Sequence, residues 1–197
     1  MISIYNLKPK FQQLLKPVLE FLHRRSITAN QITSFSIFLS FMIAVGFWFS
    51  DKYNILFLCL PIGLFLRMAL NALDGMMAKT YNQQSKKGEI LNEVGDIFSD
   101  LAIFFPLLKF EYHIIYLVVL FISLSIINEF AGILGKAVSG QRRYEGPMGK
   151  SDRAFMIGAY GIVAFLGYNQ NEYMKYFFIL LILLVTISTF VRLKKSL

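Results

Sequence analysis

The chain is poor in cysteine and in acidic residues. Cys59 is its only cysteine, so an internal disulfide is excluded and cysteine usage does not indicate a redox compartment. Only 12 residues are Asp or Glu, against 20 Lys or Arg, and charged residues make up 16% of the 197 positions. This low charge accompanies 56% hydrophobic residues, which is more than soluble domains of this size usually carry. We therefore expect an integral membrane protein.

The apolar residues gather in six uncharged runs. The runs cover residues 29–50, 53–66, 101–108, 114–128, 154–170 and 176–191. Several are shorter than the roughly 20 residues that a spanning helix needs, so those helices must include polar residues at their ends. We predict an all-α integral membrane fold, a single membrane domain over residues 1–197 with six transmembrane helices. The predicted spans are about 29–50, 53–78, 88–109, 113–137, 152–169 and 173–193.

An amphipathic helix is predicted over residues 5–25, before the first span. Its apolar residues recur at steps of three and four, with Lys and Gln between them, and Pro17 interrupts or bends it. This pattern is typical of a helix that lies in the membrane interface. A soluble helix that binds a partner protein is the alternative.

The basic residues predict the orientation in the membrane. Sixteen of them lie in the N-terminal segment, the second and fourth connections and the C-terminus, whereas the other three connections hold one each. Because short loops rich in Lys and Arg stay cytoplasmic, both termini should be cytoplasmic. The net charge of +8 then reflects this asymmetry and attraction to anionic lipid headgroups, with no nucleic-acid partner.

A row of carboxylates and carboxamides lies along the second and third predicted spans. Asn71 and Asp74 share one helical face, and Asn92, Asp96 and Asp100 share another at steps of four. Both faces lie near the cytoplasmic ends of their helices, so they can converge. Such hard oxygen ligands suit Mg²⁺ or Mn²⁺. The alternative is that these are helix-terminal polar groups that face lipid headgroups and water.

Small and basic residues accompany this row. Gly75, Ala78 and Gly88 leave room for a ligand to approach the helix backbones, and Lys79 lies beside them. A divalent ion, a close backbone approach and nearby cations together describe a site for a diphosphate. The many coincident positions favour this interpretation over isolated surface polar groups.

The stretch resembles the signature of the CDP-alcohol phosphatidyltransferases. That signature reads D-x-x-D-G-x-x-A-R, eight residues, then G-x-x-x-D-x-x-x-D. The corresponding positions here are Asn71, Asp74, Gly75, Ala78, Lys79, Gly88, Asn92 and Asp96. Two signature aspartates are asparagine and the arginine is lysine. Thr28-Ala29-Asn30 is similar to the family's T-P-N start, and residues 91–100 resemble the L-N-E-x-G-D-x-x-S-D of a bacterial inner-membrane branch.

The resemblance implies an activity and residue roles. Such enzymes hold the diphosphate of a CDP-alcohol, usually CDP-diacylglycerol, on divalent ions, and CMP leaves when a hydroxyl attacks. Asp74 would be the main metal ligand, Asn71 and Asn92 would add amide oxygens, and Asp96 would be the general base. The nucleotide would be lined by Asn30, Gly75, Ala78, Lys79 and Gly88. The resemblance also implies the bacterial inner membrane and a homodimer.

The two asparagines affect the expected number of ions. Amide oxygens are weaker ligands than carboxylates, so we expect one or two Mg²⁺ or Mn²⁺ ions rather than a certain pair. Asp100, one helical turn beyond Asp96, or Glu93 would supply the missing carboxylate. Of the two, we predict that Asp100 contributes to the metal site.

A second polar group of residues follows the fourth predicted span. Residues 149–153 resemble the basic segment of family members that accept phosphorylated alcohols, and the candidate acceptor-binding residues are Lys150, Arg153, Arg142 and Arg143. Such cations favour a small anionic acceptor such as glycerol 3-phosphate. Topology-setting charge is the alternative for each residue.

Two other functions remain open on the residues alone. A catalytically silent homologue is suggested by the two asparagines. A cation- or proton-coupled transporter is suggested by intramembrane acids, although a transporter usually places them near the midplane in related halves. No duplicated half is evident in this sequence, and the acids gather at one end, which favours chemistry on a headgroup.

Overall fold

The computed structural model describes residues 8–168 and 172–197, and every regular element in those ranges is helical. The elements are α1 (Lys8–Arg24), α2 (Ala29–Trp48), η2 (Asn54–Leu58), α3 (Cys59–Thr80), α4 (Lys86–Phe104), α5 (Leu107–Phe110), η3 (Tyr112–Ile114), α6 (Ile115–Ser139), α7 (Lys150–Phe165) and α8 (Tyr173–Ser196). The all-α prediction is confirmed. Residues 5–7 of the predicted N-terminal helix and residue 169 of the fifth span lie outside the described residues.

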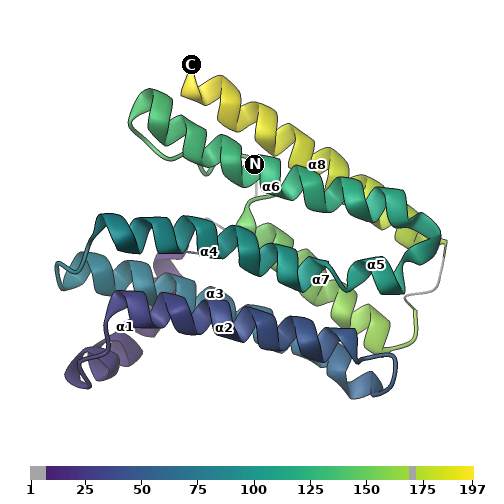
Figure 1. The fold of residues 1–197 in the computed structure, drawn as a ribbon, viewed down its shortest axis with the longest axis horizontal. Coiled ribbons are helices and arrows are strands. Elements are labelled where there is room, and N and C mark those ends of the chain that lie inside the picture. Colours follow the sequence, from purple (N-terminus) through teal and green to yellow (C-terminus); the bar gives the residue numbers. More distant parts are fainter. Residues whose placement is uncertain (1–7, 169–171) are drawn as a thin grey trace.

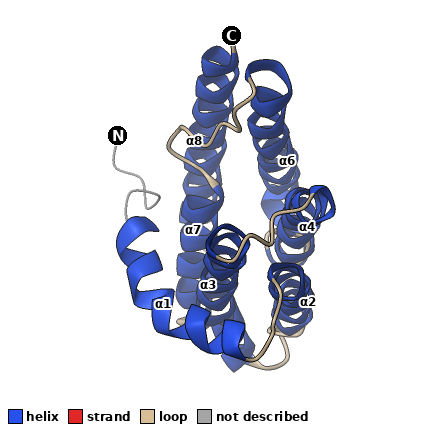
Figure 2. Ribbon diagram, turned by 90° about the vertical axis from the view of Figure 1, so that its left-hand side faces the viewer, coloured by secondary structure: helices blue, strands red, loops and turns tan. Residues whose placement is uncertain are grey.

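The helices pack in two groups. In one, α2 packs against α3 and α4, and α3 also contacts α7 and α1. In the other, α6 and α8 run side by side above them, as Figure 1 shows from one side and Figure 2 from a view turned by 90°. One apolar core joins both groups, including Leu60 of α3, Phe104 of α4, Phe121 of α6, Ile157 of α7 and Phe178 of α8. The polar residues of the third and fourth helices are thereby brought opposite the start of α7.

Four stretches are long and apolar enough to cross a membrane among the described residues. They are Ala29–Trp48, Asn54–Thr80, Tyr112–Ser139 and Tyr173–Ser196. The predicted third and fifth spans are helical as α4 and α7, but α4 carries several acids and lysines, and α7 has only 16 residues. Six membrane crossings therefore stay a prediction. It requires α4 and α7 to cross the membrane with their polar groups packed against other helices.

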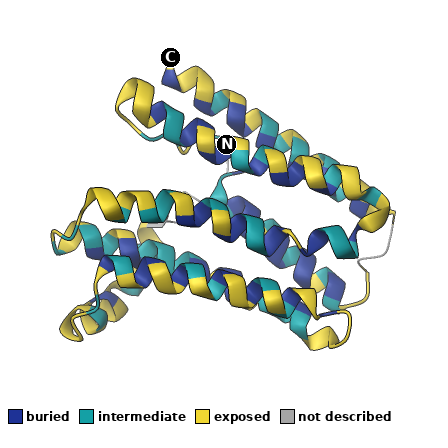
Figure 3. Cartoon of the chain, viewed as in Figure 1, coloured by how far each residue is buried: buried dark blue, intermediate teal, exposed yellow. Residues whose placement is uncertain are grey.

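The pattern of exposure is that of a protein surrounded by lipid. Large apolar side chains cover the outside, such as Phe38 and Phe65, which are 60% and 61% exposed. Several charged side chains are instead buried, and Arg67 and Arg153 are 1% exposed each. Figure 3 shows exposed positions along the outward faces of the helices. Because buried charges need partners, the interior of this bundle must contain a paired polar network.

Local sequence explains where the helices begin and end. Thr28 caps α2 through a capping box with Gln31, and the Ser85 side chain accepts a hydrogen bond from the Gly88 amide at the start of α4. Gly140 ends α6 in the left-handed conformation, with φ of 75°. These caps set the register of the polar faces on α2 and α4.

Helix α1 packs its apolar side on α3. Leu19 is buried and belongs to a small cluster with Leu73 and Met77, whereas Leu14 and Phe21 are 76% and 56% exposed. Exposed apolar residues beside a buried set fit a helix that lies against both the bundle and lipid. Its interfacial position stays a prediction.

Glu111 lies in the connection before η3 with its side chain fully buried. Its Oε1 accepts a hydrogen bond from the Tyr160 hydroxyl at 2.9 Å, and His113 Nε2 lies 3.7 Å from its Oε2. Burial raises the pKa of Glu111 to about 7, although the hydrogen bond from Tyr160 acts in the opposite direction. The folded protein therefore binds a proton here that the unfolded chain releases near pH 4.5.

We expect Glu111→Gln to stabilise the protein at high pH. Because the folded-state pKa is raised, Glu111 lowers stability progressively as the pH rises through the window from 4.5 to about 7, and the loss is complete above it. The variant should melt about 2–4 °C above the parent at pH 8 and at the same temperature at pH 4.5. Thermal melts in detergent measure this, with the exposed Glu20→Gln as control. A melting-temperature difference that is equal at both pH values would contradict the prediction.

Candidate functional site

A cavity of about 730 Å³ opens where α2, α3 and α4 face the start of α7. Residues from α1, α6 and α8 and from the two connecting loops complete its lining. Asn71, Asp74, Asn92 and Asp96 all line it. The helical spacing that predicted two converging polar faces therefore agrees with the place where the structure puts these four side chains.

The four side chains contact one another in crossed pairs. The Asn71 amide Nδ2 donates to Asp96 Oδ1 at 3.3 Å, and the Asn92 amide Nδ2 donates to Asp74 Oδ2 at 3.3 Å. Each asparagine on one helix thus bonds to the aspartate of the other helix. Asp74 and Asp96 are 4% and 7% exposed, so these bonds satisfy carboxylates that are largely removed from solvent.

Helix α2 adds two hydroxyl groups that the sequence interpretation missed. Thr33 Oγ1 donates to Asp74 Oδ2 at 2.9 Å, and Ser36 Oγ donates to Asn71 Oδ1 at 2.8 Å. The available signal was the spacing of small polar residues along one face of an otherwise apolar helix. Their hydrogen bonds hold the first signature positions of α3 against α2.

The residues predicted to line a nucleotide all lie at the cavity. They are Asn30, Gly75, Ala78, Lys79 and Gly88. A Cβ atom on Gly88 would lie 2.5 Å from Asn30 Oδ1, so glycine at this position permits the close approach of α4 to the start of α2. At Gly75 the same atom would meet nothing within 4 Å, which leaves open space over α3 for a ligand. Their role in binding a nucleotide stays a prediction.

Asp100 does not line the cavity. Its Oδ1 accepts from Arg67 Nη1 at 2.7 Å and its Oδ2 from Arg153 Nη2 at 2.8 Å, and its residue is 6% exposed. Both carboxylate oxygens are therefore bonded to arginines behind the cavity. Asp100 therefore does not face the cavity in which a metal ion is expected, and its predicted metal role stays a prediction. Its contacts instead join α3, α4 and α7.

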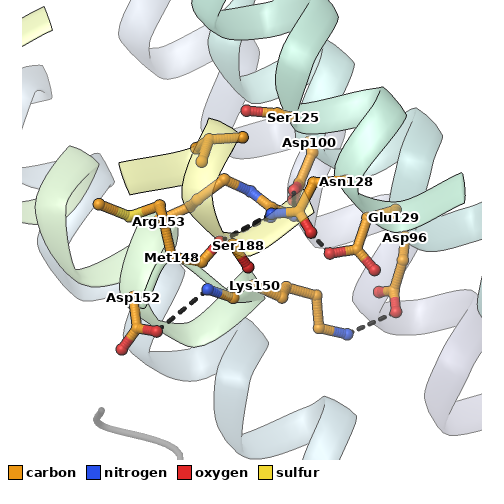
Figure 4. A network of polar contacts seen from close by, with 12 residues as sticks. Asp96, Asp100, Ser125, Asn128, Glu129, Met148, Lys150, Asp152, Arg153 and Ser188 are labelled. Atoms are coloured by element: carbon orange, nitrogen blue, oxygen red, sulfur yellow. Dashed lines mark hydrogen bonds and ion pairs between the residues drawn. The ribbon is translucent and has the colours of Figure 1, made fainter. Parts of the chain in front are cut away.

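Glu129 of α6 lies at the centre of three arginines. Its carboxylate accepts from Arg153 at 2.8 Å and from Arg142 at 2.9 Å, and Arg192 lies 3.7 Å away. Figure 4 shows Glu129, Arg153 and Asp100 in this network. Arg142 also donates to Glu93 at 2.6 Å. Glu93, the alternative candidate for the missing metal ligand, is therefore bonded to Arg142.

The sequence assigned no role to Glu129 or Arg192. Arg192 donates to the Asn128 carbonyl oxygen at 2.7 Å and is 1% exposed, although it lies among apolar residues near the end of α8. A charge that interrupts an apolar helix is the signal that it has an interior partner. It was instead counted with the topology-setting charge of the C-terminus.

The four predicted acceptor-binding cations divide between the cavity and its surroundings. Lys150 and Arg142 line the cavity, whereas Arg143 and Arg153 do not. Arg143 is paired with Glu145 at 3.9 Å. Burial alone would lower the pKa of Arg142, but the carboxylates of Glu129 and Glu93 outweigh it and raise that pKa. Lys150 and Arg142 are therefore the cations in a position to meet an acceptor.

The donor set fits one divalent ion better than two. In residues 8–168 and 172–197, no three His, Cys, Asp or Glu side chains gather as a metal cluster. Five carboxylates line the cavity, but Glu89 is paired with Lys136, Glu129 with arginines, and Asp152 accepts from the Gly149 amide. The other two, Asp74 and Asp96, lie beside the amides of Asn71 and Asn92, each of which carries an oxygen beside its nitrogen. These are the hard oxygen donors that Mg²⁺ and Mn²⁺ prefer, and Asp74 and Asp96 carry half the charge of the four aspartates in the signature.

The fold and the site define a class of protein: a helical membrane bundle with an oxygen-rich, cation-flanked cavity between its helices. The chain belongs to the CDP-alcohol phosphatidyltransferase family, which it matches over residues 26–191. The resemblance inferred from the signature positions is thereby confirmed at the level of the family.

The chain is also similar to a curated protein in sequence and to solved structures in fold. Inner membrane protein YnbA of Escherichia coli (strain K12) is 45% identical over 161 residues, which cover 82% of this chain and 80% of that protein. Phosphatidylinositol phosphate synthase (PgsA1) of Mycobacterium tuberculosis with CDP-DAG bound has the same fold, with a TM-score of 0.74 at 18% identity over 93% of this chain and 94% of that one. Its structure in complex with manganese and citrate also gives 0.74, at 19% identity over 91% and 87%.

Proposed function

We propose that this protein transfers a phosphatidyl group from a CDP-alcohol, CDP-diacylglycerol being the expected donor, to a hydroxyl acceptor and releases CMP. The observation that carries the proposal is the convergence of Asp74 and Asp96 in a cavity that the predicted nucleotide residues also line. Membership of the family and the fold shared with a protein whose structure holds CDP-DAG support it. The reaction would contribute to phospholipid synthesis.

In the expected chemistry, Asp96 is the general base for the acceptor hydroxyl. The Asp96 carboxylate accepts the proton of the attacking hydroxyl, whose oxygen forms a bond to the phosphorus that carries the diacylglycerol. The bond from that phosphorus to the bridging diphosphate oxygen breaks, and the oxygen leaves on CMP. A divalent ion held by Asp74 and Asp96, with amide oxygens of Asn71 and Asn92, would neutralise the phosphate oxygens.

Other residues of the cavity position the substrates. Gly75 leaves open space for the nucleotide over α3, and Asn30 and Gly88 line the cavity where α4 closely approaches the start of α2. Lys150 and Arg142 approach from the α7 side, where they can bind an anionic group. Glycerol 3-phosphate represents the acceptor class that we predicted from these cations.

The location and orientation of the protein belong to the same proposal. We place the protein in a bacterial inner membrane as a multi-pass protein with both termini cytoplasmic, supported by the apolar helices and by the inner membrane relative. The substrates would then enter the cavity from the cytoplasmic leaflet. The predicted homodimer stays a prediction that the family resemblance implies.

The test is CMP release by the purified protein. The protein in detergent is incubated with CDP-diacylglycerol, Mg²⁺ or Mn²⁺, and a panel of hydroxyl acceptors that includes glycerol 3-phosphate, glycerol and inositol phosphate. We expect CMP release that requires one of the acceptors and stops with EDTA. If no acceptor supports release and CDP causes no thermal shift, the transferase proposal is wrong.

One structural observation favours a second candidate, a silent homologue. Amide nitrogens, rather than further carboxylates, contact Asp74 and Asp96. Such a protein would bind the CDP-alcohol without turning it over. A thermal shift with CDP but no CMP release with any acceptor would identify this function.

A further inference from the structure

The two carboxylates proposed to hold the metal ion, Asp74 and Asp96, are bonded to groups of this chain. Asp96 Oδ2 accepts from the Lys150 ammonium at 2.5 Å, and its Oδ1 accepts from the Asn71 amide. Asp74 accepts from the Asn92 amide and the Thr33 hydroxyl. Figure 4 shows the Lys150 side chain extended from the start of α7 to Asp96. A cation of the protein therefore lies against the carboxylate where a metal ion would be expected.

Five acids and five bases make up the site around the Asp74 and Asp96 carboxylates, apart from Asp152, the Glu89–Lys136 pair and two exposed lysines, which also line the cavity. Ion pairs join four of the acids with the five bases, and the fifth acid, Asp74, is bonded to the neutral Asn92 and Thr33. The acids are Asp74, Glu93, Asp96, Asp100 and Glu129, and the bases are Arg67, Arg142, Lys150, Arg153 and Arg192. Buried charge without compensation is costly, so the net charge of a bound complex should also be small.

This balance limits the number of metal ions. The diphosphate of a CDP-alcohol bears two negative charges, because each phosphorus carries one ionised oxygen. One divalent ion compensates these two charges completely. A second would leave two positive charges in excess in a largely buried cavity, where they would interact strongly. A single ion is therefore the electrostatically matched number for this chain.

Lys150 differs from the other cations of the cavity. Arg142 and Arg192 line it as well, but Glu129 holds both of them. Lys79 and Lys86 are exposed at its rim. Lys150 is half-buried, and its ammonium reaches the carboxylate that the proposed reaction uses. An ammonium is a compact point charge that binds phosphate oxygens well.

We propose that this protein binds the diphosphate with a single divalent ion, and that the Lys150 ammonium supplies the positive charge of a second. The inference rests on the proposed function and deepens it by assigning the cation set of the same site. Lys150 would contact the diphosphate directly on the side of Asp96. Asn71 and Asn92 would keep the site neutral enough for one ion, because a carboxylate at either position would add a negative charge.

The number of bound ions tests the first part. Mn²⁺ is titrated into the detergent-solubilised protein with CDP, free Mn²⁺ is followed by its EPR signal, and a titration of CDP alone is subtracted. We expect one tightly bound Mn²⁺ per chain in the parent protein and two in Asn71→Asp/Asn92→Asp. The single variant Asn92→Asp provides the same comparison if the double variant does not fold. Two ions in the parent protein, or none while CDP still binds, would overturn the inference.

The affinity for CDP tests whether Lys150 contacts the diphosphate. With saturating Mn²⁺, Lys150→Met should weaken CDP binding about 10- to 100-fold, as expected for the loss of a charged hydrogen-bond partner. Lys136→Met is the matched control, because Lys136 lines the same cavity but is paired with Glu89. Equal affinities of the two variants would contradict a role of Lys150 in binding.

These measurements separate the inference from the transferase proposal. One bound ion and Lys150-dependent CDP binding without any CMP release would reject the transfer reaction and support the cation assignment. CMP release by a protein that binds two ions would support the transfer reaction and reject the single-ion assignment. Failure of CDP to bind under any condition would overturn both.

Discussion

Asp96→Asn is expected to lower the rate of CMP release by about 10²- to 10⁴-fold. Asparagine has nearly the same size and can still accept a hydrogen bond from Lys150, but its amide cannot take the proton of the attacking hydroxyl. Initial rates with CDP-diacylglycerol and the best acceptor measure the loss. The CDP-induced thermal shift should persist, because Asp74 and the nucleotide-lining residues remain.

Asp51→Asn is the matched control for this change. Asp51 is exposed in the connection after α2, where it pairs with Lys109 at 2.8 Å, and it does not line the cavity. The same chemical change there should leave the rate within about twofold, since an exposed ion pair contributes little. If Asp96→Asn retained more than a tenth of the parent rate, Asp96 would not be the general base.

Glu129→Ala is expected to have the largest effect on stability. The substitution would leave Arg142, Arg153 and Arg192 without the carboxylate that they share. Removing one partner from a buried charge network typically costs about 3–5 kcal/mol. For a chain of this size, we expect the melting temperature in detergent to fall by about 10 °C or more.

Glu145→Ala is the control that distinguishes loss of the buried network from loss of a glutamate in general. Glu145 pairs with Lys195 at 3.3 Å and with Arg143 at 3.9 Å, but its side chain is 34% exposed. Water can replace its interactions, so the melting temperature should fall by no more than about 2 °C. If Glu129→Ala does not yield folded protein, Glu129→Gln should show a smaller loss. Equal melting temperatures for Glu129→Ala and Glu145→Ala would contradict the network.

Much of the polar row followed from helical periodicity. Residues spaced by three and four lie on one face, so Asn71 with Asp74, and Asn92 with Asp96, were expected to share faces near the ends of two helices. In the structure, these four side chains line a cavity together with Asn30 and Gly88. Family membership, inferred from the same positions, is confirmed over residues 26–191. Their roles in catalysis and binding remain predictions.

Periodicity could not distinguish Asp96 from Asp100. The two aspartates lie one turn apart on the same helix and look alike in the sequence. In the structure, Asp96 lines the cavity, whereas Asp100 is bonded to Arg67 and Arg153 behind it. The difference depends on α7, whose position relative to α4 no local pattern encodes.

Composition and local spacing were enough to predict a helical, apolar protein with two short polar faces on neighbouring helices, because these properties depend on residues close together in the chain. Which charges meet depends instead on how the helices pack. The start of α7 brings Lys150 to Asp96, and α6 and α8 enclose Glu129 among arginines. These pairs join residues far apart in the chain, and burial decides them, since a charge inside the bundle is stable only beside its partner.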